Sequence, residues 1–197
     1  MGTIFVDNLE PQSGTSLTLG ASGDTITIPS GATITNSGTA TGFGGIFESQ
    51  LLHVRDEKSA GTQGGSGTSG YNTRDLNTVK TNEITGASLS SNQITLPSGT
   101  YYATAFAMTR RSNQNKIRLY NTTDSSTALL GNSNRSGSGD VTTNTSLVSG
   151  RFTISAQKVF ELQHYFDHND GSTSLKGEAV SGSDSEVYVD VQIWKVA

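Results

Sequence analysis

The stretch QITLPSGTYYATAFAMTRR, residues 93–111, decides the fold of this chain. Ile94 and Leu96 lead into the segment 97–99, where proline presets φ and glycine permits a positive φ, so we expect a turn there. The residues after the turn alternate in size, which predicts a long strand. Its two faces are Tyr102, Thr104, Phe106 and Met108 on one side, and Tyr101, Ala103, Ala105 and Ala107 on the other.

One face of this predicted strand is bulky and the other is small. A strand with apolar residues on both faces is buried on both, as in a sandwich sheet whose far side packs against something else, such as a second copy of the chain. We expect the bulky face, with Phe106, to meet the sandwich core. The small face of Ala103, Ala105 and Ala107 would then allow close approach near a threefold axis. The two assignments can also be exchanged.

Composition sets the fold class and excludes several functions. Of the 197 residues, 15% are charged and 32% hydrophobic, and Gly, Ser, Thr and Asn dominate the rest, which is typical of turn-rich, all-β proteins. The net charge of −4 gives no basic footprint for nucleic acid, and no apolar run is long enough to span a membrane. The first residues do not look like a secretory signal. Without cysteine, stability must come from packing or assembly.

The chain falls into three predicted regions. Residues 1–12 contain a short apolar segment, with Ile4, Phe5, Val6 and Leu9, that we interpret as a docking peptide. Residues 13–46 repeat apolar-polar-apolar triplets between Gly-Ser-Asp-Pro turns. One copy of such triplets cannot offset the ordering entropy of the turns, so we expect a stem of β-rungs wound from three chains. The alternative is a disordered linker.

Residues 47–197 read as a globular head of many short strands. No helical period occurs, and eight to ten strands in a region of this length indicate a sandwich or jelly roll. Two Gly- and Ser-rich loops, 61–70 and 131–144, are surface candidates for recognition. The expected strands are 49–56, 70–80, 92–96, 100–111, 115–122, 127–131, 145–155, 158–167, 173–180 and 186–196.

The order of these motifs carries a resemblance. ITLPSGTYYATAF (94–106), KIRLY (116–120), SLVSGRFTI (146–154), KVFELQHYF (158–166) and VYVDVQIWKV (187–196) together resemble the tumour-necrosis-factor-like and complement globular-head family. The chain departs from the family's Pro-Gly-x-Tyr-x-Phe motif by an inserted serine. The resemblance implies a ten-stranded jelly roll that forms homotrimers through inner-sheet residues. The residues implied for core or trimer contacts are Tyr101, Ala103, Ala105, Ala107, Phe106, Phe160 and Trp194.

A second resemblance concerns the first 45 residues, which are similar to the stems of bacteriophage tail- or head-fibre proteins, as in phages of marine and freshwater (cyanophage-like) hosts. It implies a virion location, docking of the N-terminus on other virion proteins, and attachment of the head to a host-surface glycan. Within that class, a capsid decoration protein (head fibre or cement) is an alternative. A free, lectin-like carbohydrate-binding module is another.

Side chains that could carry chemistry are few. No nucleophile elbow, phosphate loop or HExxH motif occurs, so we expect no enzyme and no cofactor. His164 shares parity with core residues and is interpreted as a core or axis histidine rather than a metal ligand. The segment DHNDGS (167–172) resembles a calcium loop but has its glycine one place early, so we expect a polar turn. The head-family resemblance leaves a weak possibility of an ion on the trimer axis.

Receptor contacts are the last set of candidates. Arg110 and Arg111, with Lys116 and Arg118 on the next strand, could form a basic patch for an anionic polysaccharide, although such charges are more often solvated or paired. Tyr71 could stack on a sugar, as could Tyr165 and Trp194. For Trp194 we favour a place in the core or the trimer interface.

Overall fold

The computed structural model describes residues 9–11, 13–33, 35, 37, 50–136, 142–168, 171–180 and 182–196. The chain divides into two units, Met1–Ile46 and Phe47–Ala197. The docking residues Ile4, Phe5 and Val6 lie outside the described residues, and Leu9 is 52% exposed.

The first unit, taken as a single chain, has no strand among its described residues. Among its described residues, backbone hydrogen bonds close two turns, from Asp24 N–H to the Ala21 carbonyl and from Ala32 N–H to the Pro29 carbonyl. The apolar triplets of 13–33 are exposed, with Ile26 the most open at 60%. A lone copy therefore leaves these side chains in water, and the three-chain stem stays a prediction.

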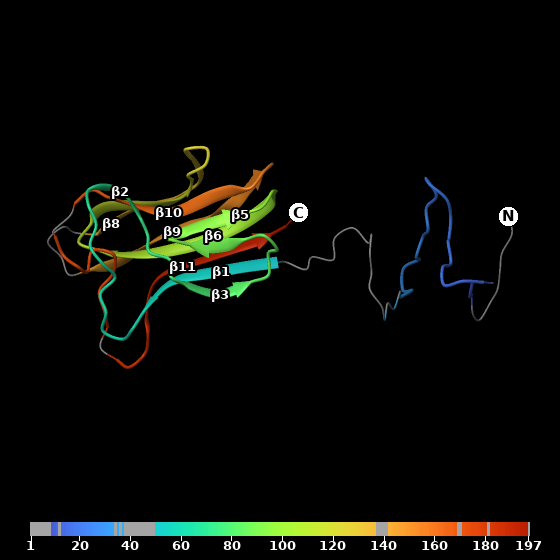
Figure 1. Ribbon diagram of the computed structural model, residues 1–197, viewed down its shortest axis with the longest axis horizontal. Coiled ribbons are helices and arrows are strands. Elements are labelled where there is room, and N and C mark those ends of the chain that lie inside the picture. Colours follow the sequence, from blue (N-terminus) through green and yellow to red (C-terminus); the bar gives the residue numbers. More distant parts are fainter. Residues whose placement is uncertain are drawn as a thin grey trace. The chain divides into compact units, whose positions relative to one another are not determined.

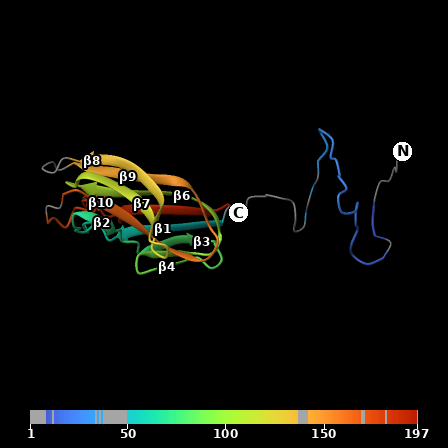
Figure 2. The ribbon, with the colours of Figure 1, turned by 90° about the horizontal axis from the view of Figure 1, so that it is seen from above.

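The second unit is built from strands alone, as the sequence predicts. Its described residues form eleven strands in two layers, which Figures 1 and 2 show from the side and from above. The strands are β1 (Gln50–Lys58), β2 (Gly70–Thr73), β3 (Thr78–Asn82), β4 (Ser88–Ser90), β5 (Gln93–Leu96), β6 (Gly99–Arg110), β7 (Asn113–Asn121), β8 (Ser126–Ser136), β9 (Thr143–Ile154), β10 (Lys158–Phe166) and β11 (Glu186–Lys195).

The two layers are antiparallel sheets. One has the strand order β3-β1-β11-β6-β9, and the other has the order β4-β5-β10-β7-β8, with β2 also paired to β10. Neighbouring strands in each sheet come from distant parts of the sequence, so the chain passes repeatedly from one layer to the other. This is a jelly roll, and the predicted all-β sandwich is confirmed.

Two predicted strands need correction, and one observed strand was not predicted. The expected strand 70–80 is two strands, β2 and β3, because the chain between them turns Arg74 and Leu76 into the interior. The short Ser-rich β4 was not expected. The segment 173–180 is not a strand: Leu175 is buried there within a series of turns. The described part of the head therefore has eleven strands rather than ten.

The faces of β6 are exchanged relative to the expected assignment. Ala103, Ala105 and Ala107 face the other sheet and are buried, whereas the bulky side faces outward, with Tyr102 43% exposed. In the sheet, each of these alanines pairs with a large apolar residue of β11, such as Val191 beside Ala105, and Ala105 also pairs with Val148 of β9. These larger neighbours occupy space between the layers, which favours small side chains on β6.

The core closes around aromatic rings at one end of β6. Tyr101 stacks on Phe152 with ring centroids 5.5 Å apart, and Phe152 meets Phe160 of the opposite sheet at 5.4 Å. The Tyr101 hydroxyl donates to the Pro97 carbonyl at 2.7 Å, so the buried ring also holds the turn that precedes its own strand. Burial raises the pKa of Tyr101.

Candidate functional site

The outward side of the five-stranded sheet is the first candidate. Alternation leaves large apolar residues of β6, β9 and β11 facing away from the core. We call this surface the apolar face, and it consists of Tyr102, Phe106, Met108, Leu147 and Trp194. Leu147 is 55% exposed in the single chain. Contiguous apolar surface of this kind marks interaction sites in soluble proteins.

The aromatic side chains of the apolar face hold one another in place. The rings of Tyr102 and Trp194 lie 6.3 Å apart, and the Tyr102 hydroxyl is 2.6 Å from Ser149 Oγ on β9. Both aromatic rings are therefore oriented before any partner arrives, which lowers the entropic cost of binding.

One carboxylate lies on the same outward side, beside the apolar face. Asp190 accepts from Arg55 Nε at 2.6 Å and from Gln192 at 3.1 Å, and His53 Nε2 is 2.8 Å from its Oδ2. Burial alone would raise the pKa of Asp190, but the hydrogen bonds from His53 and Arg55 outweigh it and hold the pKa below its usual range. The carboxylate is thus paired within its own chain, and a partner can cover it without leaving a charge unsatisfied.

The outward side of the six-stranded sheet has a different chemistry. Its centre is an aromatic–cation cluster, which consists of Tyr71, Lys116, Arg118, Tyr120 and Tyr165. The Arg118 guanidinium carbon lies 3.6 Å from the centre of the Tyr71 ring and 4.2 Å from that of Tyr120. Lys116 Nζ lies 5.9 Å from the Tyr165 ring, which meets Tyr71 edge-on at 5.4 Å. Such contacts make the cluster rigid.

A hydrogen-bonded network supports this cluster from the side. Arg118 donates twice to Gln163 Oε1, at 3.0 and 2.7 Å, and Gln163 donates to Glu161 at 2.9 Å. Thr73 and Gln93 also donate to Glu161. Burial would raise the pKa of Glu161, but these hydrogen bonds lower it more. The sheet centre is therefore a polar surface that is already satisfied in water.

An open hollow of about 630 Å³ adjoins the aromatic–cation cluster. Strands β7, β8 and β10 form it. Its lining combines two cations, one aromatic ring, amides and a hydroxyl: Gln114, Asn115, Lys116, Ser133, Asn134, Arg135 and Tyr165.

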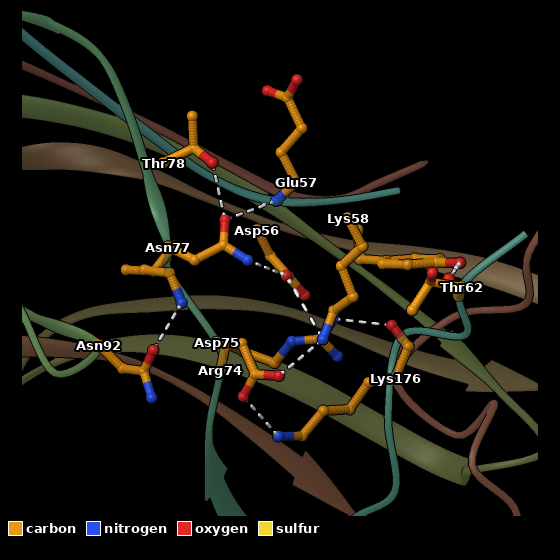
Figure 3. A network of polar contacts seen from close by, with 12 residues as sticks. Asp56, Glu57, Lys58, Thr62, Arg74, Asp75, Asn77, Thr78, Asn92 and Lys176 are labelled. Atoms are coloured by element: carbon orange, nitrogen blue, oxygen red, sulfur yellow. Dashed lines mark hydrogen bonds and ion pairs between the residues drawn. The ribbon is translucent and has the colours of Figure 1, made fainter. Parts of the chain in front are cut away.

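A network of charges lies at another place in the head, where β1 meets the loops (Figure 3). Arg74 is fully buried and donates to the carbonyls of Met108 at 3.0 Å and Lys176 at 2.7 Å. Asp75 bridges Lys58 and Lys176, at 3.0 and 3.2 Å. Burial lowers the pKa of Arg74 to about 10. These contacts join two loops to β6, so we assign the network a structural role.

The predicted receptor arginines lie elsewhere. Arg110 is 9% exposed, with its guanidinium paired to Glu178 at 2.9 Å and donating to Ser174 at 2.9 Å. It is therefore a structural anchor for the 174–178 loop and has little surface for a ligand. Arg111 stands at the β6–β7 turn with a φ of 57°. Tyr71, the third candidate, is 38% exposed and belongs to the aromatic–cation cluster.

The predicted core residues divide between the two sides of the sheet. Tyr101 and Phe160 are buried in the core with the three alanines, while Phe106 and Trp194 lie on the apolar face. His164 is also a core residue: its Nε2 is 3.3 Å from Asn115 Oδ1, and its ring meets Phe166 at 4.5 Å. Burial, together with nearby Arg74 and Lys176, lowers the pKa of His164 well below its usual value.

Sequence reasoning missed Glu161, Gln163, Tyr120 and Arg135 as surface residues. A signal for the first three exists, because polar or aromatic residues occupy every second position of 114–120 and 161–165. Arg135 lies outside these two segments.

In the described part of the chain, no three His, Asp or Glu side chains gather in a way that could hold a metal ion. Of the described residues, none belongs to a helix with the length and hydropathy of a membrane span.

Comparison with solved structures identifies the fold. The globular domain of zebrafish complement 1qA protein matches with a TM-score of 0.50 and 10% identity, over 76% of this chain and 98% of that one. The domain has the jelly-roll fold of that head. Murine APRIL matches with a TM-score of 0.49 and 9% identity over 75% of this chain and 99% of its own. Eiger TNF from S. frugiperda matches with a TM-score of 0.48 and 12% identity, over 76% of this chain and 93% of its own. No protein-family model and no curated protein sequence matches the chain.

Proposed function

We propose that the chain is a non-enzymatic structural protein of a bacteriophage particle: a homotrimer whose jelly-roll head binds the host surface. The observation that carries the trimer is the apolar face, because large side chains such as Leu147 are exposed in one copy. Burying one such side chain in an interface stabilises the assembly by roughly 1.5–3 kcal/mol. A trimer in which each copy buries the same face gains this free energy for several side chains in each copy.

The sequence resemblance supports the number three. A head of the tumour-necrosis-factor-like or complement type implies a trimer that assembles through its inner sheet. The five-stranded sheet is the one with an apolar outward side, and its carboxylate Asp190 is already paired to Arg55. A face of this composition can be covered without a large desolvation penalty.

The virion role rests on the first 46 residues. Ile4, Phe5, Val6 and Leu9 would dock on other virion proteins of the tail or capsid, and 13–46 would form the stem or linker to the head. Joining three heads turns weak contacts with a host-surface glycan into firm attachment by effective concentration. No catalytic step is needed.

The mass of the protein in solution tests the assembly. Three chains of 20.7 kDa give about 62 kDa by light scattering or native mass spectrometry. A species of one chain at micromolar concentration contradicts the proposal, because the apolar face would then be stable in water.

Imaging of purified virions with a gold-labelled antibody to the head tests the location. Label at the tail supports a tail fibre, and label on the capsid supports the head-fibre or decoration form of the same role. Particles without label contradict the virion proposal and favour the free lectin-like module.

A further inference from the structure

The hollow on the six-stranded sheet combines two kinds of group, cations and an aromatic ring. Lys116 and Arg135 bring positive charge, and Tyr165 brings a flat aromatic surface. None of the described residues that line it is a carboxylate. The charge is local, since the whole chain carries −4.

The two cations have unused hydrogen-bonding capacity. Arg135 is exposed, and its backbone is occupied by Asn134 and Asn144, but no described residue accepts a hydrogen bond from its guanidinium. The Lys116 ammonium lies 5.9 Å from the Tyr165 ring and makes no hydrogen bond or ion pair with a described residue. This contrasts with Arg118 close by, whose donors are bound to Gln163. A charged donor that is not paired within the protein remains available for an anion.

Some neutral lining residues already use their hydrogen-bonding groups within the protein, and others do not. The Asn134 amide belongs to the first kind, since it donates to the Thr145 carbonyl at 2.8 Å and accepts from Asn144 at 3.1 Å. Gln114 is exposed, and its side chain makes no hydrogen bond to any described residue. Asn115 turns its side chain into the core, where its Oδ1 accepts a hydrogen bond from Ser146 at 2.6 Å. The hollow thus offers the Gln114 amide as a neutral donor beside its cations.

The Tyr165 ring completes the hollow. It is held edge-on by Tyr71, 5.4 Å away, so its orientation is set before a ligand binds. An aromatic ring of this kind stacks on the C–H side of a pyranose, while amides and hydroxyls form hydrogen bonds with the sugar hydroxyls.

From these groups we infer that the hollow binds an acidic sugar, a pyranose that carries a carboxylate or a sulfate. The inference rests on the proposed attachment role and gives it a ligand class and a place on the head. Arg135 and Lys116 pair with the acid group, Tyr165 stacks on the ring, and Gln114 donates to a hydroxyl. A neutral sugar would use the ring and the amide but leave both cations without an anion.

Titration with two probes that differ only in charge tests this inference. The probes are tetragalacturonate and its fully methyl-esterified form, followed by saturation-transfer NMR on the full chain. We expect the acid to bind and the ester to bind at least about tenfold more weakly, as the loss of a charge-assisted hydrogen bond predicts. Equal binding of the two, or no binding of the acid, overturns the inference.

Variants locate the site. Arg135→Gln should weaken tetragalacturonate binding about tenfold without unfolding the protein, because the side chain is exposed and only its backbone is bonded. Tyr165→Ala should weaken both probes. Lys80→Gln, which also removes one positive charge but lies on β3 of the other sheet, should leave binding unchanged. If Arg135→Gln and Lys80→Gln behave alike, the hollow is not the site.

The oligomeric state of the same samples separates the two proposals. A trimer that does not prefer the acid contradicts only the acidic-sugar inference. A single chain that prefers the acid, with the preference lost in Arg135→Gln, contradicts the trimeric head and leaves the hollow assigned.

Discussion

The two outward sides of this sandwich differ in how their polar groups are arranged. The six-stranded sheet carries the aromatic–cation cluster, in which Arg118, Gln163 and Glu161 bond to one another along the surface. The five-stranded sheet carries the apolar face, where Tyr102 and Leu147 are exposed. Sheets of the same fold and alternation thus present one surface suited to water and one suited to a protein partner.

The largest expected effect comes from reversing the inward and outward sides of β6. Ala105→Trp forces a large ring between the two sheets, where Ala105 is 5% exposed, and should lower the free energy of unfolding by more than about 3 kcal/mol. Chemical denaturation measures it.

Thr104→Trp is the matched control, since it adds the same ring one residue away on the outward side. If the two variants had the same free energy of unfolding, the inward position of the alanines would be contradicted.

The second-largest expected effect is that a change on the apolar face dissociates the trimer while each head stays folded. Leu147→Lys places a charge on the apolar face at a side chain that is 55% exposed in the single chain. The head should stay folded, and the mass in solution should fall from three chains to one, because three buried ammonium groups would have no partner.

The control for this change lies on the other sheet. Tyr71→Lys adds the same charge to the aromatic–cation cluster and should leave the trimer intact. Trimers of Leu147→Lys would show that the apolar face is not the interface.

A pH-dependent effect follows from His164, which lies between the two outward sides. Its pKa is lowered by burial, so in acid the unfolded chain takes up a proton that the folded chain does not. Stability should therefore fall as pH drops below about 6.5, by up to about 1.4 kcal/mol per pH unit. Urea unfolding at pH 7, 6 and 5 measures the slope.

His164→Gln removes the titrating group while keeping a polar side chain beside Asn115. The slope between pH 7 and 5 should decrease in this variant. An unchanged slope would assign the acid sensitivity to another residue.

The difference between the two carboxylates, one on each outward side, is the smallest effect to be resolved. Both Asp190 and Glu161 have a lowered pKa, so each stabilises the fold above its unfolded pKa of about 4 and loses this contribution as the pH falls below that value. Asp190→Asn should cost about 1.5–3 kcal/mol at pH 7, since its partner Arg55 is charged.

Glu161→Gln should cost less than Asp190→Asn, because the donors to Glu161 are neutral. Thermal unfolding at pH 7 and pH 3 measures both, and the two losses should shrink at pH 3. A larger loss for Glu161→Gln would show that charged donors are not what distinguishes the two sides.

Alternation made much of this fold predictable. The parity of 101–108 gave a strand with two distinct faces, and most predicted strands lie within a few residues of the observed ones. Which face points inward was not predictable, because it depends on neighbours such as Val191 and Val148 that reach β6 from distant parts of the chain. Parity describes one strand, whereas inward and outward are properties of the whole sheet.

The sites were less predictable than the fold. Adjacent arginines at 110 and 111 looked like one basic patch, but Arg110 is buried against Glu178 of a loop 68 residues later in the chain. The residues that line the hollow come from three strands, and only the sheet register brings Lys116, Ser133 and Tyr165 together.

The charge network around Arg74 has a practical consequence for protein engineering. Arg74 and Lys176 hold their loop by hydrogen bonds to carbonyls and a carboxylate, and residues 182–185, farther along the chain, are exposed. Val180 is 72% exposed, and a side chain added at Gly182 would meet no atom within 4 Å. A foreign peptide inserted at 182–184 would be displayed on the head while both sheets keep their contacts.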